Sequence, residues 1–209
     1  HSEGGLCRNG VNISPLVPVV SEVAHLIREC QSRGIPGIYT RQTYFSSDAG
    51  MGAKRVWPRT RLGDKKGAHG GVLPTPYAIE GSWDHEIIDE IRGLIRDFPL
   101  DRVIDKPRYS AFYQTGLHNI LSVLGRRTLI ICGVTTNVCV DSTVRDAFFQ
   151  NYDVYVVREA VGSAQMHLNE AFLENFDLFF GQVMTLSEII GLLPESSLPS
   201  SQFSGGTCD

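Results

Sequence analysis

The stretch TLIICGVTTNVC, which runs from Thr128 to Cys139, decides the fold. Its first five residues form a short, mostly apolar run that is typical of a strand buried in a parallel sheet. Gly133 follows and favours a tight turn, after which a helix is expected to begin near Thr136 or Asn137. Cys139 is therefore expected in the first turn of a helix that directly follows a buried strand.

Strand-like runs alternate with amphipathic segments on both sides of this stretch. Such an alternation implies right-handed crossovers and a mostly parallel sheet with helices on both faces, which is an α/β fold. Ser82 is the expected N-cap of the second helix, and Pro107 ends the second strand. The expected helices are 16–30, 82–95, 115–124, 137–150, 168–176 and 188–193, and the expected strands are 35–40, 102–106, 128–132, 153–157 and a short one near Val183.

The composition is that of an ordinary globular protein. The 209 residues carry 19 basic and 23 acidic side chains, for a net charge of −4. This balance supplies no basic field for nucleic acid or for an anionic membrane, so neither is expected as a partner. No apolar run approaches the ~20 residues of a membrane-spanning helix, and the polar start HSEGGLCRNG lacks the apolar core of a signal peptide. We therefore expect a cytoplasmic enzyme.

The domain organisation is simple. We assign residues 1–193 to one domain, in which residues 46–81, rich in Gly and Pro, form a long loop. Residues 194–209 are rich in Ser, Pro and Gly and are expected to form a loose C-terminal tail.

Two residues stand out as candidates for chemistry, because ligands of an open parallel sheet bind beyond the carboxyl ends of its strands. The first turn of a helix favours negative charge, so a thiol at Cys139 gains thiolate character there. Lys106 ends a neighbouring strand, where Pro107 holds it extended, and a cation at that place favours the thiolate further. The alternatives are a cysteine that packs in the core and a solvated strand-end lysine.

The remaining cysteines and histidines show no functional spacing. Five cysteines without a Cys-x-x-Cys pair indicate neither a disulfide framework nor a zinc site. Cys30 and Cys132 are expected in the core, and Cys7 and Cys208 at exposed positions near the termini. Five of the six histidines are expected to be surface or partly buried residues; they are His25, His69, His85, His118 and His167.

Four segments carry a family resemblance. GVTTNVCVDSTVRDAF (133–148) resembles the nucleophile segment of the isochorismatase-like cysteine hydrolase superfamily, and DKPRYSAFYQTGLHNIL (105–121) resembles its lysine segment. GSWDHEIIDEI (81–91) and LFFGQVMTLSEI (178–189) extend the similarity over about 16–193. KPRYSAF and TNVCVDSTVRDAFF are most similar to the ureidoacrylate and biuret amidohydrolase branch, which hydrolyses ureido or carbamoyl C–N bonds.

The resemblance implies a Rossmann-like three-layer α/β/α fold with a six-stranded sheet of order 3-2-1-4-5-6, and an Asp/Lys/Cys triad. By position, Cys139 is then the nucleophile and Lys106 the cation of that triad. It also implies a cis peptide at Val134–Thr135 and an oxyanion hole formed by the N–H groups of Thr135 and Cys139.

The first strand of the family, with its general-base Asp, has no counterpart in the sequence. Its place in the sheet lies between the strands that carry Thr40 and Cys132, and its removal would leave two inner edges unpaired. We therefore expect this strand and its Asp upstream of His1. Asp105 and Glu80 are weaker alternatives for the acid, because neither matches the family position.

A second departure concerns metal. Nicotinamidases of the superfamily follow the second strand with an Asp-x-His…His metal site, whereas this sequence has TRQTYFSSDAG (40–50). We therefore expect no metal and no other cofactor, and the segment disfavours nicotinamidase activity. True isochorismatases cleave a vinyl ether without a cysteine nucleophile, so the TNVCV segment favours amide chemistry.

The expected function is cysteine-dependent hydrolysis of a C–N bond in a small ureido, carbamoyl or amide substrate, through a thioester. The alternatives are an isochorismatase-type hydrolase of another small metabolite and a non-catalytic binding member that lacks the acid. The resemblance implies a homodimer or homotetramer. Five aromatic residues are candidates for lining the substrate site, although core or loop packing is the alternative for each: Tyr44, Trp57, Tyr109, Phe112 and Tyr113.

Overall fold

The fold is an α/β arrangement built on parallel strands, as the alternation of elements predicted. A computed structural model describes residues 7, 11–44, 78–96 and 98–195 of the chain. Strand β1 (Ile38–Gln42) pairs in parallel with β2 (Arg102–Lys106). In a second sheet, β4 (Asp153–Gly162) lies between β3 (Thr128–Val134) and β5 (Gln182–Met184), again all parallel.

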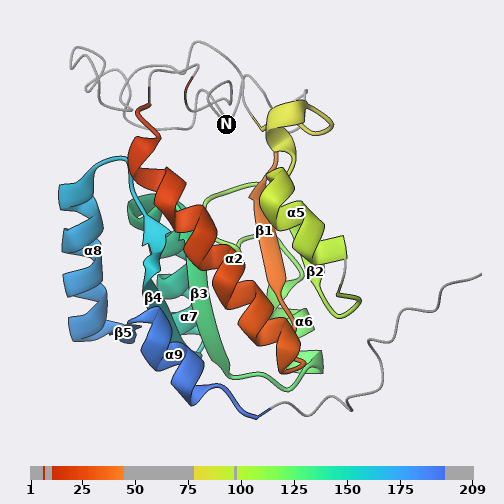
Figure 1. The fold of residues 1–209 in the computed structure, drawn as a ribbon, viewed down its shortest axis with the longest axis vertical. Coiled ribbons are helices and arrows are strands. Elements are labelled where there is room, and N and C mark those ends of the chain that lie inside the picture. The colour runs from red at the N-terminus through yellow and green to blue at the C-terminus, as the bar shows by residue number, and fades with distance from the viewer. Residues whose placement is uncertain (1–6, 8–10, 45–77, 97, 196–209) are drawn as a thin grey trace, which may run out of the picture.

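Helices cover both faces of the strands, which gives three layers (Figure 1). Helices α2 (Val17–Ser32), α5 (Asp89–Arg96) and α9 (Leu186–Leu192) lie on the face toward the viewer. Helices α6 (Leu117–Val123), α7 (Asp141–Phe149) and α8 (Met166–Phe179) pack behind and beside the strands. Three short helical turns complete the described elements: η1 (Ser14–Leu16), η3 (Trp83–His85) and η4 (Thr136–Val140).

The main core lies between the strands and α6, α7 and α8. Val144 and Ala147 of α7 are fully buried against Val156 of β4, and Phe176 of α8 is nearly so. A second core beneath α2 and α9 includes Val157 and also contains Cys30 and Cys132, where the sequence predicted them. Burial of apolar surface at about 25 cal/mol per Å² stabilises this layered packing.

Element positions agree with the sequence predictions to within a few residues except in three places. The helix expected over 137–150 is divided into the π-helical turn η4, which contains Cys139, and α7, which begins at Asp141. The helix expected from Ser82 is divided into η3 and α5, and the side chain of Ser82 accepts no hydrogen bond from the N–H groups of η3. Its hydroxyl instead lies within hydrogen-bond distance of two acceptors, the backbone carbonyl of Ile79 and the carboxylate of Asp84. Strand β4 is twice as long as predicted, because it continues beyond Val157 to Gly162. The expected loop at 46–81 and tail at 194–209 lie mostly outside the described residues.

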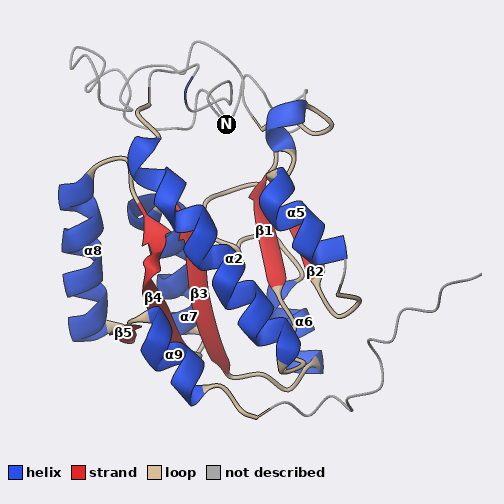
Figure 2. Cartoon of the chain, in the orientation of Figure 1, coloured by secondary structure: helices blue, strands red, loops and turns tan. Residues whose placement is uncertain are grey.

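The described strands form two parallel sheets, one of two strands and one of three. The pairings β2–β1 and β3–β4–β5 are compatible with the predicted order 3-2-1-4-5-6, which stays a prediction. Strand β3 is an end strand of its sheet, and α2 runs in front of β1 and β3 (Figure 2). Within the described ranges, β1 pairs only with β2 along its length, and β3 pairs only with β4. Each therefore keeps one inner edge without a ladder partner there.

Two glycines offer a matched test of this packing. A methyl group at Gly181 would collide with the carbonyl oxygen of Val154 and the ring of Phe176, whereas one at Gly191 would meet nothing within 4 Å. We expect Gly181→Ala to lower the free energy of unfolding by about 1–3 kcal/mol, because the β4–β5 contact must shift. Gly191→Ala should stabilise the protein by up to about 1 kcal/mol, since alanine favours the helix. Urea denaturation measures both, and equal effects would contradict this packing.

Candidate functional site

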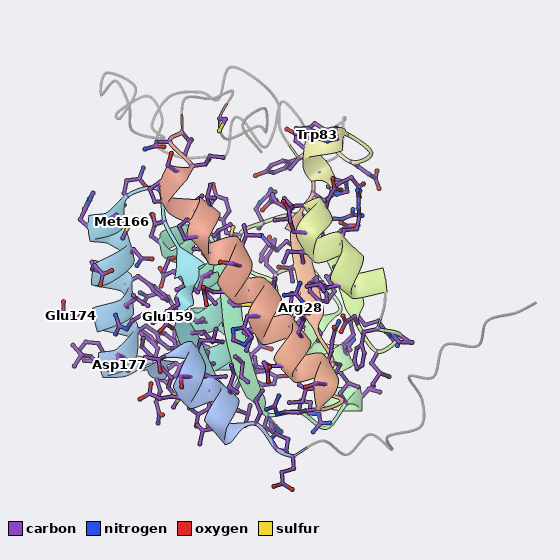
Figure 3. All side chains as sticks on the ribbon, in the orientation of Figure 1. Arg28, Trp83, Glu159, Met166, Glu174 and Asp177 are labelled. Atoms are coloured by element: carbon purple, nitrogen blue, oxygen red, sulfur yellow. The ribbon has the colours of Figure 1, made fainter. Side chains whose placement is uncertain are left out.

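The two residues singled out in the sequence lie in contact. Lys106 is the last residue of β2 and is 3% exposed, and Cys139 lies in η4, directly after β3. The Nζ atom of Lys106 is 3.5 Å from the Sγ atom of Cys139. The parallel strands end at the upper end of the molecule in Figure 3, where the labelled Trp83 and Met166 follow β1 and β4. The site is therefore at the edge of the sheet where ligands of such folds bind.

The ammonium group of Lys106 makes two further contacts. It donates to the side-chain oxygen of Gln42 at 3.3 Å and to the backbone carbonyl of Arg108 at 3.2 Å. A buried ammonium is costly unless its N–H groups have acceptors, so these contacts stabilise the charge beneath the surface.

A buried polar layer supports the turn that carries Cys139. The fully buried Thr136 donates its hydroxyl hydrogen to Asn169 of α8 at 2.7 Å. Ser163, 1% exposed at the end of β4, donates to the side chain of Asn137 at 2.7 Å. The Val134–Thr135 peptide bond before this turn is cis, at the bond for which the resemblance predicted it. The turn is thus tied to two neighbouring elements.

Thr143 joins the nucleophile segment to the lysine segment. Its hydroxyl donates to the carbonyl of Cys139 at 2.7 Å and accepts from the backbone N–H of Ala111 at 3.0 Å. Thr143 and Ala111 are both buried. One hydroxyl group therefore fixes the start of α7 relative to the loop that follows Lys106.

The other cysteines of the core lie in a different electrostatic setting. Burial among apolar side chains raises the pKa of the Cys30 thiol to about 11 and that of Cys132 to about 12. Both therefore remain protonated at neutral pH and behave as the core residues that the sequence predicted.

A second polar cluster lies at the ends of β1 and β2. The Arg41 guanidinium binds Asp105 and holds the pKa of that carboxyl below its usual range, and a hydrogen bond from Thr43 acts in the same direction. His85 is 3% exposed, with Nε2 at 2.8 Å from the hydroxyl of Thr43 and 3.3 Å from Asp105. The sequence predicted His85 as a surface or partly buried residue; the structure buries it, with the Thr43 hydroxyl and the Asp105 carboxylate as polar partners of Nε2.

Two of the predicted substrate-lining residues have a defined packing role. The Phe112 ring packs against Tyr152, with centroids 5.6 Å apart, which is the core alternative. Tyr44 forms an isolated parallel bridge with Ile79. Tyr109 is partly buried and Tyr113 is exposed, and both follow Lys106 in the chain. Trp57 lies outside the described residues.

The described part of the chain contains no group of three His, Cys, Asp or Glu side chains arranged to hold a metal ion. None of its described helices is both long and apolar enough to cross a bilayer.

Comparison with known proteins gives independent evidence. The model of the Isochorismatase domain family matches residues 4–188. The chain belongs to the Isochorismatase domain family. The match includes both η4, which carries Cys139, and β2, which carries Lys106, and it confirms the resemblance of the nucleophile and lysine segments.

The curated relatives within the family are amidohydrolases by name. Ureidoacrylate amidohydrolase RutB of Methylobacterium radiotolerans is 33% identical over 186 residues, which cover 87% of this chain and 70% of that protein. RutB of Enterobacter sp. is 32% identical over 202 residues, which cover 94% of this chain and 85% of that protein. The predicted enzyme class, a hydrolase that acts on C–N bonds, is thus the class of these relatives.

Solved structures establish the family fold. The nicotinamidase/pyrazinamidase PncA of Bacillus subtilis has a TM-score of 0.67 at 22% identity, over 81% of this chain and 86% of that chain. N-carbamoylsarcosine amidase of Thermoplasma acidophilum has a TM-score of 0.62 at 24% identity, over 81% and 83%. Both share the α/β fold described above.

Sequence reasoning missed three residues in or beside this candidate site. Gln42 and Thr143 contact Lys106 and Cys139 directly, and His85 belongs to the adjoining cluster. Gln42 could have been found from the parallel pairing of β1 with β2, which sets it opposite Lys106. Thr143 lies one helical turn after Cys139, a spacing at which a threonine hydroxyl reaches the earlier carbonyl.

The raised pKa values of Cys30 and Cys132 predict that iodoacetamide alkylates these thiols more slowly than Cys139. At neutral pH, a thiol with a pKa of about 11 is ionised in about 1 molecule in 10⁴. Iodoacetamide should therefore modify Cys139 well before Cys30 or Cys132, as peptide mass mapping would show. Urea-unfolded protein, in which all thiols are exposed, is the control. Equal rates at Cys30 and Cys139 in the folded protein would contradict this assignment.

The two hydrogen bonds of the Thr143 hydroxyl predict that Thr143→Val and Thr143→Ser differ in stability and in the alkylation rate of Cys139. Thr143→Val leaves the buried N–H of Ala111 without its acceptor, which should cost about 1–3 kcal/mol of unfolding free energy and slow the alkylation of Cys139. Thr143→Ser keeps the hydroxyl and should retain most of both properties. Alkylation rates and urea denaturation measure the two effects. The same loss in both variants would show that the methyl group, rather than the hydroxyl, matters.

Proposed function

We propose that the protein is a cysteine-dependent amidohydrolase that cleaves a C–N bond of a small ureido, carbamoyl or amide substrate. The observation that carries this proposal is the 3.5 Å contact between the Lys106 ammonium and the Cys139 sulfur. An ammonium so close favours the thiolate, which is the nucleophilic form of cysteine. Membership of the Isochorismatase domain family and the similarity to RutB proteins support the amide class.

The first half of the reaction is acylation. The thiolate of Cys139 attacks the substrate carbonyl, a C–S bond forms, and the carbonyl π electrons move to oxygen. We assign stabilisation of that oxyanion to the backbone N–H groups of Thr135, the N-cap of η4, and of Cys139 within η4. Collapse of the tetrahedral intermediate breaks the C–N bond, and ammonia or an amine leaves with a proton from a general acid.

The second half is hydrolysis of the thioester. The conjugate base of the same general acid takes a proton from water, and the resulting oxygen nucleophile attacks the thioester carbonyl. The C–S bond breaks, so the thiolate of Cys139 is restored beside Lys106 and the product acid is released.

The general acid is a carboxylate on a further strand between β1 and β3. The support for this proposal is that each of these strands has an inner edge without a ladder partner within the described residues. A strand inserted there would complete the order 3-2-1-4-5-6 and end beside Cys139. Asp105 is a poor substitute, because its carboxylate is bound to Arg41 and Thr43.

The proposal is tested by ammonia release from ureidoacrylate, biuret, carbamoyl amino acids and simple amides. Cys139→Ala should lower turnover at least about a thousand-fold, because the nucleophile is lost. Lys106→Met should lower it about a hundred-fold, because the thiolate loses its cation. Cys30→Ala is the control, since it removes a thiol of the core beneath α2.

The turnover of Cys139→Ala on the best substrate decides whether the cysteine mechanism is right. If it keeps near-normal turnover while folding normally, the cysteine mechanism is wrong. If none of the C–N substrates releases ammonia with the wild-type protein, the amidohydrolase assignment is wrong.

A further inference from the structure

The side chain of Gln42 makes two contacts with Lys106. The two residues lie opposite one another in the parallel pairing of β1 with β2. The amide oxygen of Gln42 accepts from Nζ of Lys106 at 3.3 Å, and its NH₂ group donates to the Lys106 backbone carbonyl at 3.0 Å. A reversed amide would set its NH₂ group against the ammonium, so these contacts fix its orientation.

These contacts complete the coordination of a buried charge. An ammonium carries three N–H donors, and the structure gives Lys106 three acceptors: Gln42, the carbonyl of Arg108 and the sulfur of Cys139. The first two are neutral oxygens. They satisfy hydrogen bonds that burial would otherwise leave unmade, but they do not cancel the positive charge. The sulfur is thus the one acceptor of the three that can become an anion.

We propose that Gln42 is a positioning residue that directs the charge of Lys106 onto Cys139. It holds the ammonium within reach of the sulfur and, because it is neutral, does not itself offset the positive charge that stabilises the thiolate. This role rests on the proposed function, in which Lys106 acts through that thiolate. It adds a reason for a neutral amide, rather than a carboxylate, at the end of β1.

Two substitutions at Gln42 are expected to differ in effect. Gln42→Glu keeps the shape and the acceptor for Nζ and loses the NH₂ donor to the Lys106 carbonyl, and its carboxylate shares the charge of the ammonium and repels a thiolate. Gln42→Met keeps most of the volume and removes both polar contacts. The other charges near the end of this strand pair, those of Arg41, Asp105 and Glu86, are the same in both variants.

The experiment is the rate of iodoacetamide modification of Cys139 against pH, followed by peptide mass mapping. For Gln42→Glu we expect the midpoint of the profile to rise by about one pH unit or more, the size of shift that a like charge at contact distance produces. For Gln42→Met we expect a smaller rise, because a freed ammonium spends part of its time away from the sulfur. Gln182→Glu, at the exposed amino end of β5, has the same net charge as Gln42→Glu and should leave the profile unchanged.

Lys106→Met separates this proposal from the function on which it rests. If Lys106→Met shifts the profile and both folded Gln42 variants match the wild type, Gln42 has no positioning role and the proposed function stands. If Lys106→Met leaves the profile unchanged, the role of Lys106 and that of Gln42 are both wrong. A purely structural role for Gln42 predicts similar shifts in Gln42→Glu and Gln42→Met and would overturn the charge argument. Circular dichroism and urea denaturation establish that each variant is folded.

Discussion

The contact between an ammonium and a sulfur beneath the protein surface is the interaction on which the site depends. Lys106 and Cys139 are far apart in sequence, yet parallel strands bring their ends to one edge of the sheet. A charge so buried requires acceptors, and the fold supplies them from β1 and from the loop after β2. Much of the polar structure near this edge, including the Thr143 bridge, is explained by the need to keep these two groups together.

The layered fold provides the rigidity that this contact needs. Helices α6, α7 and α8 bury their apolar faces on one side of the strands, and α2, α5 and α9 cover the other. The turn that carries the nucleophile is tied to α8 through Thr136 and to the end of β4 through Ser163. Side chains held by packing and buried hydrogen bonds keep the geometry that catalysis requires.

Much of the fold and the central pair could be predicted from the sequence. The alternation of apolar runs and amphipathic helices gave every described strand, and the run before Gly133 placed Cys139 after a buried strand. The remainder depends on tertiary contacts that local patterns do not encode. Ser82 resembles an N-cap in sequence, but its hydroxyl bonds elsewhere. Gln42 and His85 acquire roles only when β1 and β2 pair and η3 packs against their ends.

The most direct test is the ultraviolet absorption of the thiolate, measured against pH as the difference between the wild-type protein and Cys139→Ala. We expect Lys106→Met to move the rise of the Cys139 thiolate absorption to higher pH, because the ammonium that contacts the sulfur is lost. The account is contradicted if the wild type and Lys106→Met give the same curve. It is also contradicted if the wild-type signal develops only in the range in which Cys30 and Cys132 ionise, near pH 11 to 12.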